Sequence, residues 1–274
     1  MTVHCRNRAR RVALDLGSTP GSEIASYAAL MDGADGRTAI VTSAASGIGL
    51  ALASALAAAG SRVLMTDIDG AAVKAAATWV QANGGLVEFR EVDVRDEDAV
   101  QQAAQRAVEQ FGALHIVVNN VNTENRDTRW KQPLDELRDA LDVRGLVHGI
   151  RGFVPHILES CGGHVVNIAP VAVVVPYQGV DPCMVSQNAV LGISEVLRVE
   201  LASAGAPIGV NTVLPGIVRT DMSPVGTANS EVIAEKVLDA ICHNRPYVDT
   251  DDYGAAVLAR FGEMLKACSV TRDA

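Results

Sequence analysis

The amino-acid sequence predicts an α/β protein with one doubly wound parallel sheet, covered by helices on both faces. From Arg37 onward, short apolar runs alternate with amphipathic stretches, a pattern typical of βαβ units. Hydrophobic residues make up 49% of the 274 residues and aromatic residues only 4%, which suits a core of Ala, Val, Leu and Ile. A glycine-rich turn directly follows the first apolar run.

The apolar runs predict the strands. They lie near residues 38–42, 62–66, 86–92, 114–119, 163–169 and 208–214, with a last short strand near 246–248. The intervening amphipathic stretches predict helices near 47–59, 70–82, 96–110, 134–159, 184–204, 230–243 and 251–267. An α/β unit of this length folds around one core, so we expect a single domain over residues 36–274.

Residues 1–35 lack this alternation. Four arginines come early, at Arg6, Arg8, Arg10 and Arg11, and Gly, Ser and Pro follow. We expect a poorly ordered N-terminal extension; an Arg-rich transit peptide is the alternative.

Charge and cysteine usage exclude several classes of function. The formal net charge of -9 repels phosphate backbones and anionic lipid headgroups, so neither nucleic acid nor a membrane is an expected partner. No apolar run is long enough to span a bilayer. The five cysteines are scattered without a C-x-x-C pair, which argues against a disulfide framework and a metal site. We therefore expect a cytoplasmic protein that acts on a small molecule.

The glycine-rich turn predicts a dinucleotide site. Ser43, Ser46, Gly47, Ile48 and Gly49 lie between the first strand and the first helix, where backbone N–H groups and a helix N-terminus can hold a diphosphate.

The end of the second predicted strand carries Asp67, followed by Ile68. A carboxylate there accepts hydrogen bonds from the adenosine ribose and repels a 2′-phosphate, which favours NAD(H) over NADP(H). Two structural alternatives remain. Gly47 and Gly49 would also suit close helix–strand packing, and Asp67 could be a solvated turn residue beside the helix cap Asp69.

Further motifs along the chain resemble those of the short-chain dehydrogenase/reductase family, whose members have the Rossmann fold. They are Thr42-Ser43-x-x-x-Gly47-Ile48-Gly49, Asp93-Val94, Asn119-Asn120 and Pro215-Gly216-Ile217-Val218-x-Thr220. The resemblance covers roughly residues 35–222. It implies that Asp93 and Val94 contact the adenine, that Asn119 lies beside the cofactor, and that Thr220 binds the nicotinamide carboxamide.

The positions that carry the family's hydride chemistry differ from the family pattern. A helix Asn, a Ser and the Tyr and Lys of Y-x-x-x-K fall on Asp142, Pro170, Cys183 and Gln187. Pro170 has neither a hydroxyl nor an N–H group. Gln187 can still hydrogen-bond a ribose, but it carries no charge with which to lower a neighbour's pKa. Ordinary ketone reduction by the family mechanism is therefore not expected.

Cofactor binding itself stays open at this point. Ser43 replaces the first glycine of the family motif, and Val121-Asn122 replaces Ala-Gly, so additional side-chain atoms lie where the family backbone approaches the nucleotide. NAD(H) binding is retained in one interpretation and lost in the other.

Four residues are candidates for altered chemistry: Asp142, Cys183, Tyr177 and Asp181. Asp142 adds an ionisable group to the expected cleft, and its alternative is a hydrogen bond within its helix. Cys183 has no activating Lys or His nearby in sequence, which favours a packing role. Tyr177 and Asp181 follow the fifth strand, where the resemblance places the substrate pocket.

Three functions follow from these observations. The first is a divergent enzyme that uses the pocket for non-hydride chemistry, such as cyclisation, elimination, isomerisation or rearrangement. The second is a catalytically inactive member that acts as a nucleotide sensor or structural partner. The third is an NAD(H)-dependent oxidoreductase with relocated acid/base residues. The resemblance also implies a homodimer or homotetramer assembled through the helices at 134–159 and 184–204.

Overall fold

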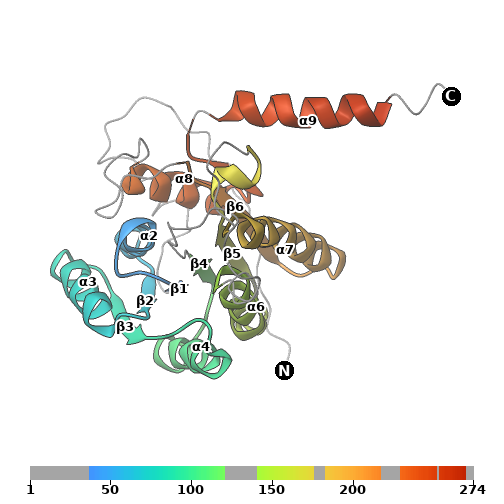
Figure 1. Ribbon diagram of the computed structural model, residues 1–274. Coiled ribbons are helices and arrows are strands. Elements are labelled where there is room, and N and C mark those ends of the chain that lie inside the picture. The colour runs from blue at the N-terminus through green and yellow to red at the C-terminus, as the bar shows by residue number, and fades with distance from the viewer. Residues whose placement is uncertain (1–36, 121–140, 176–182, 217–228, 252, 270–274) are drawn as a thin grey trace, which may run out of the picture.

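The computed structural model describes residues 37–120, 141–175, 183–216, 229–251 and 253–269 (Figure 1). Its centre is a seven-stranded sheet in the order β3-β2-β1-β4-β5-β6-β7, in which every neighbouring pair is parallel. The strands are β1 (Thr38–Val41), β2 (Arg62–Asp67), β3 (Val87–Glu91), β4 (Ile116–Asn119), β5 (Gly163–Ile168), β6 (Ile208–Leu214) and β7 (Tyr247–Asp249). This single α/β domain is the Rossmann-type fold that the sequence predicts.

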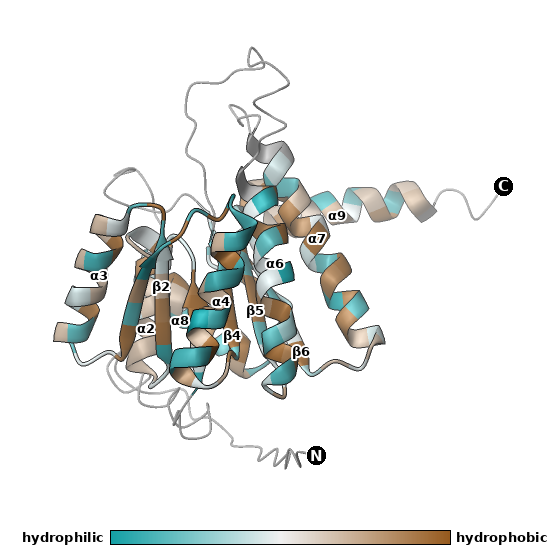
Figure 2. Ribbon diagram, turned by 90° about the horizontal axis from the view of Figure 1, so that it is seen from below, coloured by the Kyte–Doolittle hydropathy of each residue, from teal (hydrophilic) through white to brown (hydrophobic). Residues whose placement is uncertain are grey.

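Helices cover both faces of the sheet (Figures 1 and 2). One face is covered by α2 (Gly47–Ala58), α3 (Gly70–Ala82) and α8 (Ser230–Cys242). The other is covered by α4 (Glu97–Phe111), α6 (Leu141–Glu159) and α7 (Cys183–Ser203). A short 3-10 turn, η1 (Val171–Val173), follows β5, and α9 (Gly254–Ser269) runs outward from the body.

Two apolar clusters hold these layers together, and β1 contributes to both. Ala39 and Val41 face the α2–α3–α8 side, whereas Ile40 faces the α4–α6–α7 side. All three are fully buried, because side chains alternate between the faces of a strand and both faces of this sheet are covered. The core is built mainly from aliphatic residues, as the composition predicts.

The chain order places a switch point between β1 and β4. From β1 the chain builds outward to β2 and β3, then returns to β4 on the other side of β1. Loops that leave β1 and β4 therefore diverge, and a crevice opens at the carboxyl ends of these strands, where open α/β sheets bind their ligands.

The predicted elements are confirmed, with shifts at their ends. The fourth strand begins at Ile116 rather than near residue 114, and the last helix begins at Gly254 rather than near residue 251. The predicted start of the helix at 134–159 and the N-terminal extension lie outside the described residues. Among the helices of the described segments, none combines the length and apolar character that crossing a bilayer requires.

Packing of α6 against the sheet predicts a large effect of Phe153→Ala. Phe153 is 1% exposed within the cluster that joins α4, α6 and α7 to the sheet, so truncation leaves a cavity. We expect a loss of about 3 to 5 kcal/mol in the free energy of unfolding, measured by urea titration. Trp79→Ala is the control: Trp79 is 57% exposed on α3, and its removal should change the free energy by less than about 1 kcal/mol. Equal losses in the two variants would contradict this packing.

Candidate functional site

The turn between β1 and α2 has a backbone that leaves no room for extra side chains. Ser43 and Gly47 have φ values of +49° and +54°, in the left-handed region. A Cβ atom added to Gly49 would lie 2.1 Å from the Ser43 carbonyl oxygen and 2.7 Å from Nδ2 of Asn120. Glycine at position 49 is thus required by the close approach of α2 to the turn. Ser43 thus adopts a left-handed backbone conformation that glycine adopts more readily.

Hydrogen bonds fix this turn to three strands. The Thr42 hydroxyl donates to the Val118 carbonyl at 3.2 Å and accepts from the Asn120 N–H at 2.9 Å. The Ala44 N–H donates to the Thr66 carbonyl at 2.9 Å. The ends of β1, β2 and β4 are therefore linked, and the turn is held rigidly at the crevice.

The N-terminus of α2 differs from those of its neighbours. Asp69, Asp96 and Asn229 cap α3, α4 and α8 by accepting backbone N–H groups of the first turn. Within the described part of the chain, the Ser46 side chain makes no such bond to α2, and the first turn of α2 contains no acidic residue. Its N–H groups and the positive end of the helix dipole are thus left for an anion.

Asp67 lies at the end of β2, directly beside the turn. One of its oxygens, Oδ2, accepts the Ala45 N–H at 3.1 Å, and Oδ1 accepts the Asp69 N–H at 3.1 Å. A carboxylate offers about four acceptor positions, so room remains for ribose hydroxyls. Next to it, Ile68 is 58% exposed at the edge of the crevice. Asp67 is therefore more than a solvated turn residue, because it also holds the glycine-rich turn.

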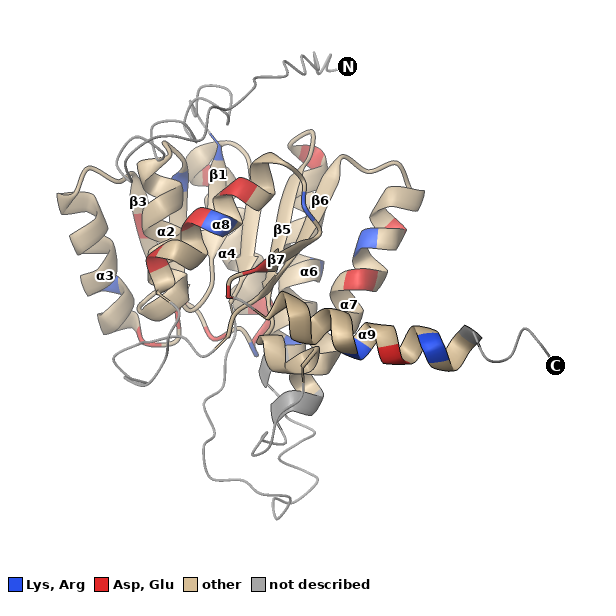
Figure 3. Cartoon of the chain, turned by 90° about the horizontal axis from the view of Figure 1, so that it is seen from above, with Lys and Arg blue, Asp and Glu red and all other residues tan. Residues whose placement is uncertain are grey.

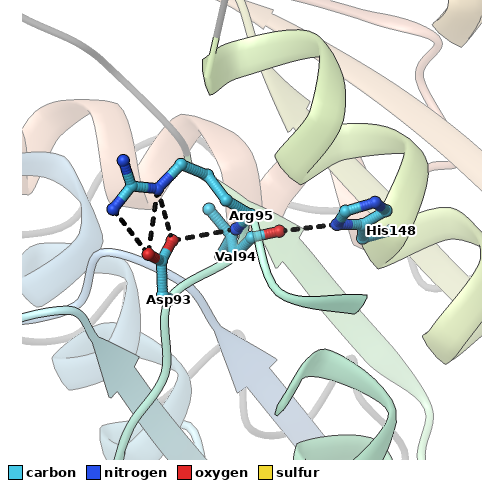
Figure 4. A network of polar contacts seen from close by, with 4 residues as sticks. All are labelled: Asp93, Val94, Arg95 and His148. Atoms are coloured by element: carbon cyan, nitrogen blue, oxygen red, sulfur yellow. Dashed lines mark hydrogen bonds and ion pairs between the residues drawn. The ribbon is translucent and has the colours of Figure 1, made fainter. Parts of the chain in front are cut away.

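Asp93 follows β3 and forms an ion pair that its sequence motif did not predict (Figure 4). Both carboxylate oxygens accept from the Arg95 guanidinium, at distances of 2.6 to 2.9 Å, and Oδ1 also accepts the Arg95 N–H. These hydrogen bonds lower the pKa of the Asp93 carboxyl, against a smaller opposing effect of desolvation. An adenine amino group that approaches Asp93 must share it with Arg95.

The same loop is attached to α6. Nδ1 of His148 lies 2.9 Å from the Val94 carbonyl oxygen, so the ring donates to it (Figure 4). His148 thereby fixes the segment after β3 against the helix that carries Asp142.

Asn119 belongs to a buried polar chain. Its Nδ2 donates to Asn167 of β5 at 2.8 Å, and Asn167 donates to the Ser194 hydroxyl of α7 at 2.8 Å. The Asn119 Oδ1 atom has no hydrogen-bond partner among the described residues, and it lies 2.3 Å from where a Cβ on Gly149 would be. Because Asn119 is only 4% exposed, its side chain contributes to the support behind the crevice.

Of the four positions that depart from the resembled motif, the structure describes the side chains of Pro170 and Gln187. Pro170 follows β5 by two residues, and its carbonyl oxygen already accepts the Val173 N–H at 3.0 Å. Gln187 lies in the second turn of α7 and is 2% exposed. Cys183 begins α7, and Asp142 lies in the first turn of α6, but their side chains are outside the described residues, as are Tyr177 and Asp181.

The segment after β6 is held by a residue that the sequence did not single out. Oδ2 of Asp251 accepts the Gly216 N–H at 2.8 Å and the Thr250 hydroxyl at 3.2 Å. A Cβ on Gly216 would lie 2.7 Å from the Tyr253 ring. The chain continues from here to Thr220, which lies outside the described residues. Asp251 and Arg95 escaped prediction because neither belongs to a motif; both occur in ordinary charged stretches.

The structure therefore brings Ser43, Ser46, Gly47, Ile48, Gly49 and Asp67 together at one edge of the sheet, with Asp93 and Val94 on the next loop. Their contacts with a cofactor remain predictions, as do those of Gln187 and Thr220. The uncapped helix, the lack of space at Gly49 and the carboxylate of Asp67 all fit a dinucleotide.

Comparisons with known proteins agree with this geometry. Residues 37–230 match the family model described as short chain dehydrogenase. The 1-deoxy-11-beta-hydroxypentalenate dehydrogenase of Streptomyces avermitilis is 36% identical over 215 residues, which cover 74% of this chain and 79% of that protein. The protein of the same name from Streptomyces exfoliatus is 32% identical over 227 residues, covering 77% and 82%.

A solved structure shows the same similarity in three dimensions. The short-chain dehydrogenase/reductase of Burkholderia phymatum, determined in complex with NAD, superposes with a TM-score of 0.79 at 25% identity. The superposition covers 85% of this chain and 95% of that one. With the family model matched over most of the described sheet, this chain belongs to the short-chain dehydrogenase/reductase family.

Proposed function

We propose that this chain is an NAD(H)-dependent oxidoreductase whose acid/base groups are residues other than the Ser, Tyr and Lys that the family uses. The observation that carries the nucleotide part is the N-terminus of α2, which lacks the side-chain cap of its neighbours and meets a turn too tight for any residue but glycine at position 49. The names of the related proteins, dehydrogenase in both Streptomyces species, support the oxidoreductase part.

The chain would hold the dinucleotide along the carboxyl ends of β1 to β4. Backbone N–H groups from Ser46 to Gly49 would bind the diphosphate, and Asp67 would accept from the adenosine ribose. Ile68 and Val94 would border the adenine, with Asp93 shared between the adenine amino group and Arg95. When bound, the nicotinamide supplies or accepts the hydride.

Asp67 favours NAD(H) over NADP(H) because its negative charge would face a 2′-phosphate. Two backbone N–H groups hold its carboxylate in place, so the side chain cannot turn away without breaking both hydrogen bonds. The Burkholderia phymatum structure with NAD is consistent with this preference.

Reduction of a carbonyl group requires one proton in addition to the hydride, and Pro170 and Gln187 cannot deliver it. Pro170 has no proton to give, and its carbonyl is engaged by Val173. Gln187 is neutral. We assign proton transfer to the group formed by Asp142, Cys183, Tyr177 and Asp181, of which Asp142 and Asp181 are carboxylates suited to acid/base work.

A second candidate is a member that binds the nucleotide without turnover. The occupied Pro170 carbonyl favours it, because this position then offers neither a proton nor a free acceptor to a reacting group. Non-hydride chemistry gains no support from the related proteins, whose names describe redox enzymes. A small-molecule substrate and a cytoplasmic location remain predictions.

Nucleotide titration tests the binding step. The wild-type protein should change the fluorescence of NADH and bind NADH with a lower Kd than NADPH. Asp67→Asn should raise the Kd for NADH at least about tenfold and reduce the ratio between the two Kd values. Asp69→Asn is the matched control, because Asn also caps a helix and Asp69 faces α3 rather than the turn. If the wild-type chain binds neither nucleotide, both candidate functions fail.

Alanine substitutions at two helical glycines, Gly49 and Gly192, test whether the turn between β1 and α2 binds the diphosphate. Gly49→Ala should abolish NADH binding and destabilise the fold, because the new Cβ overlaps the Ser43 carbonyl. Gly192→Ala, whose Cβ would meet nothing within 4 Å, should stabilise the protein by up to about 1 kcal/mol and leave Kd unchanged. Calorimetry measures the Kd for NADH, and thermal melts measure the stability of each variant. Equal NADH affinities in the two variants would show that the turn does not hold the diphosphate.

Turnover of a panel of ketones and alcohols with NADH or NAD separates the two candidates. If the proposal is correct, the wild-type chain has activity that Asp142→Asn lowers by about 10²-fold or more in kcat. If the chain only binds nucleotide, the wild type is inactive, and the triple variant Pro170→Ser, Cys183→Tyr and Gln187→Lys gains ketoreductase activity. Full activity in Asp142→Asn would remove Asp142 from the mechanism.

A further inference from the structure

A cavity of about 600 Å³ lies at the amino-terminal edge of the sheet, opposite the crevice. It opens where β1, β4, β5 and β6 begin, on the side of the body away from α9 (Figures 2 and 3). Arg37 directly precedes β1, His115 directly precedes β4, and His164 is the second residue of β5. Parallel strands all begin at one edge, so these residues meet although they are far apart in sequence. The volume suits a small organic molecule.

Charge favours an anion in this cavity. Among the described residues that line it, Arg37 alone carries a formal charge, and its guanidinium makes no hydrogen bond or ion pair within the described segments. Such a guanidinium is a strong donor to oxyanions. The thiol of Cys242 also lines the cavity and stays neutral, because burial and the nearby charge of Asp239 raise its pKa. The C-terminal ends of α6 and α8, where helix dipoles are negative, border the same edge, which favours an anion that keeps a proton over one with two full charges.

His164 presents a hydrogen-bond acceptor to the cavity. Its Nδ1 atom lies 3.0 Å from Oδ1 of Asn211. The Nδ2 atom of Asn211 already donates to the carbonyl oxygens of Ala240 and Arg245, at 3.3 and 2.6 Å. Its Oδ1 atom is therefore the acceptor, and Nδ1 of His164 is the donor. A neutral imidazole with its proton on Nδ1 has a lone pair on Nε2.

His115 presents a donor. Its Nδ1 atom accepts the Thr38 N–H at 3.1 Å, so the neutral ring carries its proton on Nε2. The His164 N–H donates to the His115 carbonyl oxygen at 2.8 Å, which holds the two residues on adjacent strands. No other group in the described part of the chain hydrogen-bonds to the Nε2 atom of either ring, and neither atom is sealed from solvent. The cavity therefore offers a donor and an acceptor that a ligand can use.

Both imidazoles are neutral at pH 7. Burial lowers the pKa of His115 and His164, and the positive charge of Arg37 lowers both further. The charge of Arg62 adds to this effect at His115, whereas the hydrogen bond from Asn211 opposes it at the other ring. The Arg37 guanidinium thus lies within electrostatic reach of both rings.

We propose that this cavity binds a hydrogen-phosphate group, either free or as the monoester of a small organic molecule. Arg37 and the Nε2–H of His115 donate to the phosphate oxygens, and the P–OH group donates to Nε2 of His164. The volume leaves room for an organic part beside the phosphate. The cavity shares no residue with the glycine-rich turn, so this binding does not depend on a nucleotide.

Three anions test the O–H group in the wild-type chain. At about pH 8 inorganic phosphate keeps a P–OH group, whereas sulfate has none and phenyl phosphate, with a second pKa of about 6, has lost its own. Calorimetry should then give inorganic phosphate a Kd at least about tenfold lower than either, because both leave Nε2 of His164 without a partner.

The same titrations at about pH 6 identify the source of the phosphate. Phenyl phosphate regains its proton, so its Kd should fall at least about tenfold from the value at the higher pH. We expect it to fall below the Kd of inorganic phosphate, which would indicate an organic monoester. The reverse order would indicate that the cavity binds free phosphate.

Two variants locate the site. Arg37→Gln should raise the Kd for inorganic phosphate at least about tenfold. His164→Asn should bring the Kd values of phosphate and sulfate within about twofold of each other, because the Asn amide can replace Nδ1 toward Asn211 but nothing replaces Nε2. Arg245→Gln is the matched control: it removes the same charge from the same edge, but Arg245 is already paired with Asp239 at 2.6 Å, so the Kd should not change. Thermal melts without phosphate check that each variant folds.

Several results would overturn the proposal. One is the absence of phosphate binding at about 10 mM, and another is equal Kd values for phosphate and sulfate in the wild type at about pH 8. Retained phosphate affinity in folded Arg37→Gln, or displacement of phosphate by NADH, would place the anion elsewhere, such as at the N-terminus of α2. The comparison of anions needs no substitution, so it decides the matter even if a variant fails to fold.

Discussion

The close approach of α2 to the end of β1 is the constraint on which the rest of the nucleotide edge depends. With the Ser43 carbonyl 2.1 Å from where a Cβ on Gly49 would be, the helix can begin there only without a side chain. The approach directs the first N–H groups of α2 into the crevice, and the Thr42 hydroxyl and Asp67 carboxylate then fix the turn to the neighbouring strands. Ser43 can replace glycine because these hydrogen bonds offset the cost of its left-handed backbone, about 1 kcal/mol.

The residues proposed to bind the nucleotide and the residues at the four positions of the family's hydride chemistry lie on different parts of the chain. Substitutions in one group can therefore occur without changes in the other. The nucleotide edge is built from β1, α2, β2 and the loop after β3, where the family pattern persists. The altered positions lie at the start of α6, after β5 and in the first two turns of α7. Changes at Pro170 or Gln187 leave the hydrogen bonds of the glycine turn untouched. The glycine-rich turn therefore does not depend on the residue types at positions 170 and 187.

Much of the fold follows from local pattern, and much of the site detail does not. Short apolar runs predict β1, β2, β5 and β6, because both faces of this sheet are buried. The glycine turn and Asp67 follow from the ends of these strands. Arg95 could not be predicted as the partner of Asp93, since the motif specifies residue types and not side-chain directions. The Asp251–Gly216 contact joins residues far apart in sequence, and only the parallel pairing of β6 with β7 brings them together. The direction of α9 depends on the hydrogen bonds of Arg260 and the packing of Tyr253 and Val257 against the η1 cluster, in a helix with no motif.

The base of α9 touches the segments that follow β5 and β6, through Arg260 on the η1 turn and Tyr253 beside Gly216. The 16 residues of this helix thus help to hold the η1 turn. Trimming would leave the glycine turn and Asp67 in place, because the hydrogen bonds that hold them are made among β1, β2, β4 and their loops. It would release the η1 turn from Arg260, so a truncated chain would loosen the segment that follows Pro170 while the hydrogen bonds of the glycine turn stay in place.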